Sequence, residues 1–423
     1  MESQKNRIYV CIDLKCFFAS VECVERNLDP SQVNLVVADP SRGKGALCLA
    51  ISPHMKSIGV KNRCRLFEIP ENIEYITALP RMNKYMAYSA EIYSIYLKYI
   101  SKDDIHVYSI DEVFIDITDY MKLYQMTSTQ IAKMLIDDVY NTLGITATVG
   151  IGTNMYLAKI AMDIIAKHVD SHMASLNEEM YKKYLWNYTP LTDFWQIGPG
   201  IARRLALKFN VYDMQGLAHV NEKRLYKEFG VTAQYLIDHA WGKEPTTIAD
   251  IKAYQPKSNS ISNSQVLFED YTYEEALLVL KEMVELNVID LVSKHLVTNH
   301  VSMYIGYSKD EVSPTGGSKK IGVRTNSLQI LNENFIDIFT KTTHKDYLIR
   351  RIGISFNDVM DEVYEYYDLF TDLDQIQDER NLNIAISQIK GNYGKNAVVK
   401  GMNLLDKATT IKRNTLVGGH NAE

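Results

Sequence analysis

The chain has 423 residues, which leaves room for two to four small domains rather than one core. It is 46% hydrophobic and 23% charged, like an ordinary globular protein, and its net charge of −6 does not support a uniformly basic nucleic-acid binder. We see no secretion signal and no apolar run of membrane-spanning length, so we expect a cytoplasmic protein without a membrane partner. The five cysteines form no C-x-x-C pair, which argues against a zinc site and against a disulfide framework.

The first expected element is a short strand, residues 7–11, which leads to Asp13 and is followed by a helix over residues 16–26. Apolar runs at residues 34–38 and 46–51 flank a loop. A long helix is expected over residues 82–100. Its tyrosines recur at near-helical spacing, which predicts packing rather than contact with DNA; they are Tyr85, Tyr88, Tyr93, Tyr96 and Tyr99.

Residues 105–118, IHVYSIDEVFIDIT, consist of two β-rich halves around Asp111 and Glu112, which predicts a hairpin with acids at its bend. The pattern continues with a helix, a strand and a second helix, at residues 129–143, 145–151 and 154–167. This order resembles βαββαβ and predicts a mixed sheet with helices on one face.

A second region begins near residue 188 and contains Gly198 and Gly200 between two helical patterns. A glycine turn at a helix N-terminus can present N–H groups to a phosphate, but an ordinary helix connection has the same pattern. Residues 253–263 are rich in Ser and Asn and predict an exposed linker. Residues 264–361 then have the order β, α, β, β, α, β of a small α+β domain, and residues 362–423 are expected to be a tail that is poorly ordered by itself.

Three carboxylates carry the chemistry that the sequence suggests. Asp13 ends one predicted strand, and Asp111 and Glu112 lie at the bend of the hairpin. Nucleotidyl transfer with two Mg²⁺ ions needs hard oxygen ligands that converge from rigid elements. Each acid alone is more simply explained as a turn former, so the hypothesis depends on the three together.

Three segments resemble motifs of the Y-family DNA polymerases. DLKCFFASVE (residues 13–22) and YSIDEVFIDIT (residues 108–118) are similar to the two catalytic motifs of that family. TVGIGTNMYLAKIAMDIIAKH (residues 148–168) resembles the segment that carries a triphosphate-binding lysine. The resemblance covers nearly the whole chain and is strongest to the UmuC-like (ImpB/MucB/SamB) branch.

The resemblance implies a multi-domain α+β protein, shaped like a right hand, with a ferredoxin-like palm and a helical thumb that contains a helix-hairpin-helix. The implied little finger is a four-stranded α+β domain. The implied domains are the palm (residues 1–30 and 81–187), fingers (31–80), thumb (188–252), linker (253–263), little finger (264–361) and tail (362–423).

The resemblance also implies roles for single residues. Asp13, Asp111 and Glu112 would be catalytic and, with the Leu14 carbonyl, would bind two Mg²⁺ ions, for which Mn²⁺ could substitute. Phe18 would be the steric gate that rejects a ribose 2′-hydroxyl. The remaining assignments are Phe17, Lys56 and Lys159 to the nucleotide and Gly198 and Gly200 to DNA.

The implied activity is low-fidelity, template-directed translesion synthesis on primer–template DNA with deoxynucleoside triphosphates, and no segment is left for a proofreading exonuclease. YYDLF (residues 366–370) resembles a sliding-clamp-binding motif, in which Leu369 and Phe370 would be the anchors. The alternative is that these two side chains pack on the little finger. A UmuD-like protein or a recombinase is a further candidate partner.

Two other functions stay open at this point. A nucleotide cyclase uses a similar sheet, acid pair and two metals without a template, although the glycine turn and the separate carboxyl-terminal domain argue against it. A non-catalytic DNA-binding relative is the second alternative, and the presence of all three acids argues against that.

Overall fold

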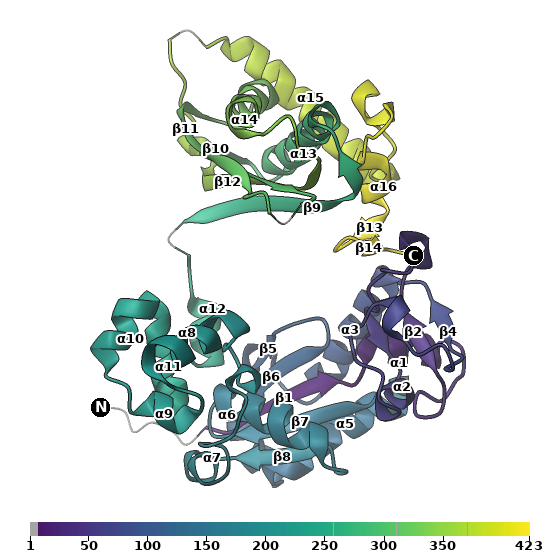
Figure 1. Cartoon of the computed structure of the whole chain (residues 1–423), viewed down its shortest axis with the longest axis vertical. Coiled ribbons are helices and arrows are strands. Elements are labelled where there is room, and N and C mark those ends of the chain that lie inside the picture. The colour runs from purple at the N-terminus through teal and green to yellow at the C-terminus, as the bar shows by residue number, and fades with distance from the viewer. Residues whose placement is uncertain (1–6, 257, 310, 370) are drawn as a thin grey trace. The chain divides into compact units, whose positions relative to one another are not determined.

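The computed structural model describes residues 7–256, 258–309, 311–369 and 371–423. Contacts divide the chain into two compact units. The first extends to Tyr254 and includes Ala422–Glu423, and the second runs from Gln255 to Asn421. Figure 1 shows the helices and strands of each unit. Among the residues described, no helix is long and apolar enough to span a bilayer.

The first unit is built on a five-stranded sheet (Figure 1). Its central strand, β1, pairs antiparallel with β6 on one side and with β7 on the other. The outer pairs are β5–β6, which is antiparallel, and β7–β8, which is parallel, so the sheet is mixed, as predicted. In sheet order the strands are β5 (Ile105–Val107), β6 (Glu112–Asp116), β1 (Tyr9–Leu14), β7 (Ala147–Gly152) and β8 (Met173–Leu176).

Helices cover both faces of this sheet, so the prediction that they lie on one face is wrong. Side chains alternate along a strand, and Val10 and Ile12 of β1 join the core on one face while Cys11 points to the other. On that other face, β7 carries Gly150 and Gly152, where an added Cβ would lie only 2.0 and 2.2 Å from backbone atoms of Ala158. These glycines therefore permit the close approach of a helix. The helices are α1 (Phe17–Val24), α3 (Met82–Leu97) and α5 (Ser128–Leu143) on the first face, and α6 (Met155–Ile160) on the second.

The rest of the first unit consists of a small sheet and a group of short helices. The small sheet has the order β3 (Ala50–Ile51), β2 (Leu35–Val37), β4 (Ile76–Ala78), and α2 (Pro53–Ser57) follows β3 directly. The short helices bury Leu205, Leu225 and Leu236 in a second core, to which residues of α6 also contribute. Their bounds are α7 (Glu178–Tyr184), α8 (Pro199–Phe209), α9 (Met214–Ala218), α10 (Glu222–Phe229), α11 (Ala233–Ala240) and α12 (Ile248–Ala253), while α4 (Thr118–Tyr124) follows β6.

The second unit contains a four-stranded sheet in the order β11-β10-β12-β9, in which all neighbouring strands are antiparallel. The expected order β, α, β, β, α, β is present. The first strand is longer than expected and begins at Asn259, inside the stretch predicted to be a linker. The elements are β9 (Asn259–Tyr271), α13 (Tyr273–Ser293), β10 (Leu296–Tyr307), β11 (Thr315–Thr325), α14 (Leu328–Thr342) and β12 (Ile349–Asp361).

The carboxyl-terminal tail, for which the sequence predicts poor order by itself, is folded against the rest of the second unit. It forms a long helix, α15 (Leu373–Tyr393), then α16 (Thr410–Asn414) and a hairpin of β13 (Leu416–Val417) and β14 (His420–Asn421). The reason lies in α13, which contacts α15 as well as the sheet. Its Glu282 is 1% exposed and accepts hydrogen bonds from the backbone N–H groups of Thr409 (2.7 Å) and Thr410 (3.3 Å).

Candidate functional site

The three predicted acids meet at one end of the β1–β6 pair. Asp13 lies directly opposite Glu112 in the antiparallel register, and the Leu14 N–H donates to the Asp111 carbonyl at 2.9 Å. Directly opposite residues of such a pair have side chains on the same face, with Cβ atoms roughly 5 Å apart. The first strand and the hairpin bend therefore bring Asp13 and Glu112 together, as the sequence predicted, with Asp111 next to them.

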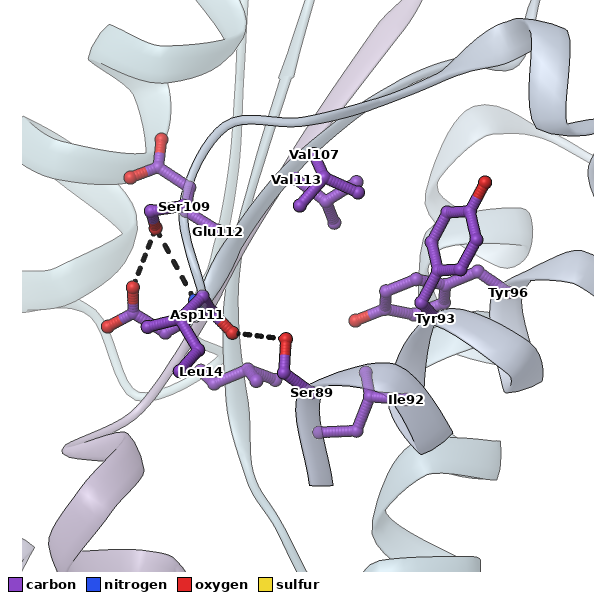
Figure 2. A pocket seen from close by; sticks show the side chains of 11 residues that line it. Leu14, Ser89, Ile92, Tyr93, Tyr96, Val107, Ser109, Asp111, Glu112 and Val113 are labelled. Atoms are coloured by element: carbon purple, nitrogen blue, oxygen red, sulfur yellow. Dashed lines mark hydrogen bonds between the residues drawn. The ribbon is translucent and has the colours of Figure 1, made fainter. Parts of the chain in front are cut away.

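The bend that carries the acid pair is fixed by short hydrogen bonds. The Ser109 hydroxyl donates to Asp111 Oδ1 at 2.7 Å, and the Ser89 hydroxyl on α3 donates to the Ile110 carbonyl at 2.6 Å. Figure 2 shows the small pocket behind this bend, where Tyr93 and Ile92 lie opposite the hairpin. The bend is thus anchored to a helix of the core, which holds Asp111 in one place.

Two lysines and a fourth acid from the α6 side complete the site. The Lys159 ammonium lies 2.8 Å from Glu112 Oε2 and 3.0 Å from Asp163 Oδ2. The Lys167 ammonium lies 2.7 Å from Asp163 Oδ1 and 3.6 Å from Asp13 Oδ2. Residues spaced by four lie on one side of a helix. The helical segment from residue 155 to 168 therefore presents a Lys–Asp–Lys row to the strand acids, through a π-helical stretch at Ala161–Ile165.

The electrostatics reflect crowded negative charge. The pKa of the Asp13 carboxyl is raised to about 6, mainly by burial; Lys167 opposes the increase, while the neighbouring Asp111 and Glu112 add to it. Burial alone would lower the pKa of the Lys159 ammonium, but the acidic groups around it raise that pKa above its ordinary value. In the absence of an added cation, the Asp13 carboxyl therefore remains protonated to a higher pH than an ordinary aspartate.

The donor set fits a divalent cation of the magnesium type, which prefers carboxylate and carbonyl oxygens. Within the ranges that the structure describes, no three His, Cys, Asp or Glu side chains are already arranged as a metal site. The Lys159 ammonium instead lies among the carboxylates, at hydrogen-bonding distance from Glu112. The raised pKa of Asp13 shows that additional positive charge at this position would be stabilising.

The other predicted residues lie in different surroundings. Phe18 is partly exposed near the start of α1, whereas Phe17 is 3% exposed in the core. Lys56 is exposed in the last turn of α2. Gly198 and Gly200 are exposed at the N-terminus of α8. In the second unit, Leu369 is 99% exposed, and Phe370 lies outside the described residues.

Asp163 and Lys167 were not among the site residues predicted from the sequence. A signal was present, because Lys159, Asp163 and Lys167 recur at intervals of four in a segment predicted to be helical. The four-residue spacing alone does not show that this row faces the acids. That orientation follows from the close packing of the helix on the two glycines of β7.

Comparison with known proteins gives consistent matches along the chain. The impB/mucB/samB family matches residues 12–163, and the carboxyl-terminal domain of the same family matches residues 258–369. The "Putative UV-damage repair protein UvrX" of Bacillus subtilis is 30% identical, covering 97% of both chains. "DNA polymerase IV 2" of the same organism is 28% identical over 98% of this chain and 99% of its own length. A solved "Y-family DNA polymerase chimera Dbh-Dpo4(243-245)-Dbh" aligns with a TM-score of 0.64 at 20% identity, covering 84% of this chain and 99% of the other.

Proposed function

Because this chain belongs to the impB/mucB/samB family of Y-family DNA polymerases, we propose that it extends a primer along damaged template DNA with low fidelity. The enzyme is a DNA-directed DNA polymerase, a nucleotidyltransferase that uses deoxynucleoside triphosphates. The observation that carries the proposal is the opposition of Asp13 and Glu112 across β1 and β6, with Asp111 beside them. Three acids brought together from distant parts of the chain match the needs of phosphoryl transfer.

The domains are assigned from the elements that surround this site. The five-stranded sheet is the palm, the small sheet with α2 is the fingers, and the helices from α8 to α12 are the thumb. The four-stranded unit is the little finger, and α15 and α16 extend it. A fold of this kind would place the acids of the palm beside a nucleotide held by the fingers.

Asp13, Asp111, Glu112 and the Leu14 carbonyl would hold two Mg²⁺ ions, or Mn²⁺ in their place. Bound there, such ions would lower the pKa of the primer hydroxyl and offset the charge of the pyrophosphate leaving group. The protein contributes rigidity: Ser109 fixes Asp111, and the strand register fixes Asp13 against Glu112. These side chains would then need little reorganisation when a nucleotide binds.

The lysines divide into two roles. Lys159 was expected to contact the triphosphate, but it is 7% exposed and bonded to Glu112, so we assign it to orienting that carboxylate. The side chain of Lys167 is 32% exposed, which suits it to a ligand that enters from solvent. Lys167 and the exposed Lys56 would therefore bind the negative phosphates.

DNA would be positioned by its backbone, while base pairing with the template selects the nucleotide. The turn at Gly198 and Gly200 is exposed at the first turn of α8, a helix of 11 residues. Free N–H groups at such a helix end can bind a DNA phosphate. This supports the assignment of the two glycines to the primer–template contact.

A sliding clamp is the proposed protein partner. Tyr366 is tied to the sheet by backbone hydrogen bonds with Arg324, and Leu369 three residues later is 99% exposed. A large apolar side chain with that exposure is available to fill a pocket on a partner. Leu369→Ala should abolish stimulation by a bacterial clamp without changing synthesis in its absence, whereas Leu373→Ala, at an exposed residue outside the motif, should keep the stimulation.

The experiment that tests the activity is primer extension across an abasic site, with purified full-length protein and Mg²⁺ or Mn²⁺. We expect extension by the native chain and none by Asp111→Ala or Glu112→Ala. Incubation with nucleotides alone separates the alternatives, because a cyclase would form a product without primed template. A native chain that bound primed template but never extended it would instead be a non-catalytic relative, and the proposed activity would be wrong.

A further inference from the structure

The partly exposed ring of Phe18 rests on a buried tyrosine. The ring centroids of Phe18 and Tyr85 are 4.4 Å apart and their planes differ by 15°, which is a stacked arrangement. Tyr85, on α3, is fully buried, with 0% of its surface exposed. Phe18 follows Asp13 by five residues, so the stacked pair lies at the start of the helix that leads away from the acid cluster, which consists of Asp13, Asp111, Glu112 and Asp163.

The tyrosine is itself held by a buried carboxylate. The Tyr85 hydroxyl donates to Glu22 Oε1 at 2.8 Å, and Glu22 is 0% exposed. The Arg81 guanidinium donates to both Glu22 oxygens, at 2.9 and 2.8 Å, and Arg26 donates to Oε2. Burial alone would raise the pKa of the Glu22 carboxyl, but hydrogen bonds from Arg81, Arg26 and Tyr85 lower it below its ordinary value, so it remains ionised.

A ring can reject a single added oxygen atom only if it cannot move away. Phe18 has no polar atom with which to fix its own orientation, so its position depends on what it packs against. A side chain at a reactive site is held to the required precision by a second layer of packed and hydrogen-bonded groups. Glu22, Arg81 and Tyr85 form such a layer directly behind Phe18.

We propose that Tyr85 is a positioning residue for sugar selection, which supports the Phe18 ring so that a ribonucleotide is rejected. The inference rests on the proposed function, because it requires that an incoming nucleotide binds beside Phe18. Tyr85 does not touch the nucleotide and acts only through the ring stacked on it.

The test compares single-nucleotide incorporation of a deoxyribonucleotide and the matching ribonucleotide by the full-length protein. Tyr85→Leu removes the stacked ring, and we expect the preference for the deoxyribonucleotide, measured as the ratio of kcat/KM values, to fall about tenfold, the scale of one lost ring–ring contact. The change should appear as a lower KM for the ribonucleotide, with kcat for the deoxyribonucleotide nearly unchanged. Tyr85→Phe keeps the ring, and Arg81 still holds Glu22, so this variant should keep the preference.

A matched variant separates this role from general damage to α3. Ile95 lies on the same helix, ten residues after Tyr85, and is 2% exposed. Ile95→Ala should lower the melting temperature as Tyr85→Leu does, yet leave the sugar preference unchanged. If Ile95→Ala relaxed the preference equally, or if Tyr85→Phe behaved like Tyr85→Leu, the inference would be overturned.

The double variant Phe18→Ala/Tyr85→Leu makes the test specific to the pair. Without the Phe18 ring, loss of Tyr85 should have no additional effect on the preference, because the two residues act as one unit. If Phe18→Ala relaxes the preference but Tyr85→Leu does not, only the present inference fails. If Phe18→Ala itself has no effect while primers are extended, the steric-gate assignment fails as well, and the two failures are distinguishable.

Discussion

Two carboxylate sites, one in each unit, are stabilised in opposite ways. Glu282 accepts hydrogen bonds from the Thr409 and Thr410 N–H groups and from the Asn403 side-chain amide at 2.9 Å, all of them neutral donors from the tail. Asp13, Asp111 and Glu112 instead lie beside one another, and two lysines form ion pairs with Asp13, Glu112 and Asp163. The four carboxylates of this acid cluster outnumber its two ammonium groups, so the cluster keeps a net negative formal charge.

The contrast separates a carboxylate that holds the chain together from a group that can accept a ligand. Fixed N–H donors satisfy Glu282 completely, so a cation would gain little there and would have to break those bonds. The acid cluster keeps uncompensated negative charge, which is visible in the pKa of Asp13, raised to about 6 by burial and by its acidic neighbours. The uncompensated charge at the acid cluster lowers the stability of the folded protein, and bound cations could restore it.

The largest effect is expected when the acid cluster is altered without changing its shape. Asp111→Asn keeps an oxygen for the Ser109 hydrogen bond but removes the charge. Primer extension should fall by at least about a thousandfold, because the lost group stabilises charge in the transition state. The matched change Glu282→Gln should leave activity per folded molecule unchanged. Steady-state extension assays check both, and an Asp111→Asn enzyme within tenfold of the native rate would remove the distinction between the two sites.

The second prediction concerns the stability of the tail. Glu282→Gln replaces one accepting oxygen by an NH₂ donor, which faces either the Thr409 N–H at Oε2 or the Thr410 N–H and the Asn403 amide at Oε1, so a buried donor loses its partner. The cost should be about 1–3 kcal/mol, the range for an unsatisfied buried group. Hydrogen exchange should accelerate in residues 400–415. Glu269→Gln is the control: its side chain is 58% exposed and bonds Lys407, and it should change stability little.

A pH-dependent difference is expected for Asp13. Its pKa is about 6 in the folded protein and ordinarily 3.8, so between these values the folded state binds more protons than the unfolded state. Stability from this group is therefore full below about pH 4 and is lost as the pH rises to about 6. Asp13→Asn should stabilise the metal-free protein by at most about 3 kcal/mol above pH 6 and have little effect at pH 4. Thermal unfolding in chelator at both pH values would measure this, and an equal effect at the two would contradict it.

The acid cluster could be predicted from the sequence because the ends of these strands can be recognised from the residue pattern. β1 and the hairpin are short, apolar and interrupted by acids, and the antiparallel pairing of two such strands brings Asp13 and Glu112 together. The lysine row could not be placed, because helical spacing shows that Lys159 and Lys167 share a side but not which surface that side faces. The close approach at Gly150 decides this, and it depends on packing between distant segments.

The second unit shows a different limit. The order of its strands and helices could be predicted from the sequence. However, β9 begins in a polar run, NSISNS, that has the composition of a linker. It becomes a strand because β12 supplies hydrogen bonds along its length. The tail also has a polar composition, and its order depends on Glu282, more than a hundred residues away. Local patterns carry no information on such partners.

The smallest effect should distinguish the two lysines of the acid cluster. Lys167 is the more exposed of the two, so Lys167→Gln should raise the KM for the incoming nucleotide about tenfold with little change in melting temperature, the scale of one lost charge contact. Lys159→Gln should instead lower stability and kcat, because Glu112 loses the cation that orients it in a buried setting. Lys133→Gln, at a lysine with a 65% exposed side chain on α5, is the control and should change neither quantity. A raised KM in Lys159→Gln with none in Lys167→Gln would reverse the two roles and return the triphosphate contact to the buried lysine.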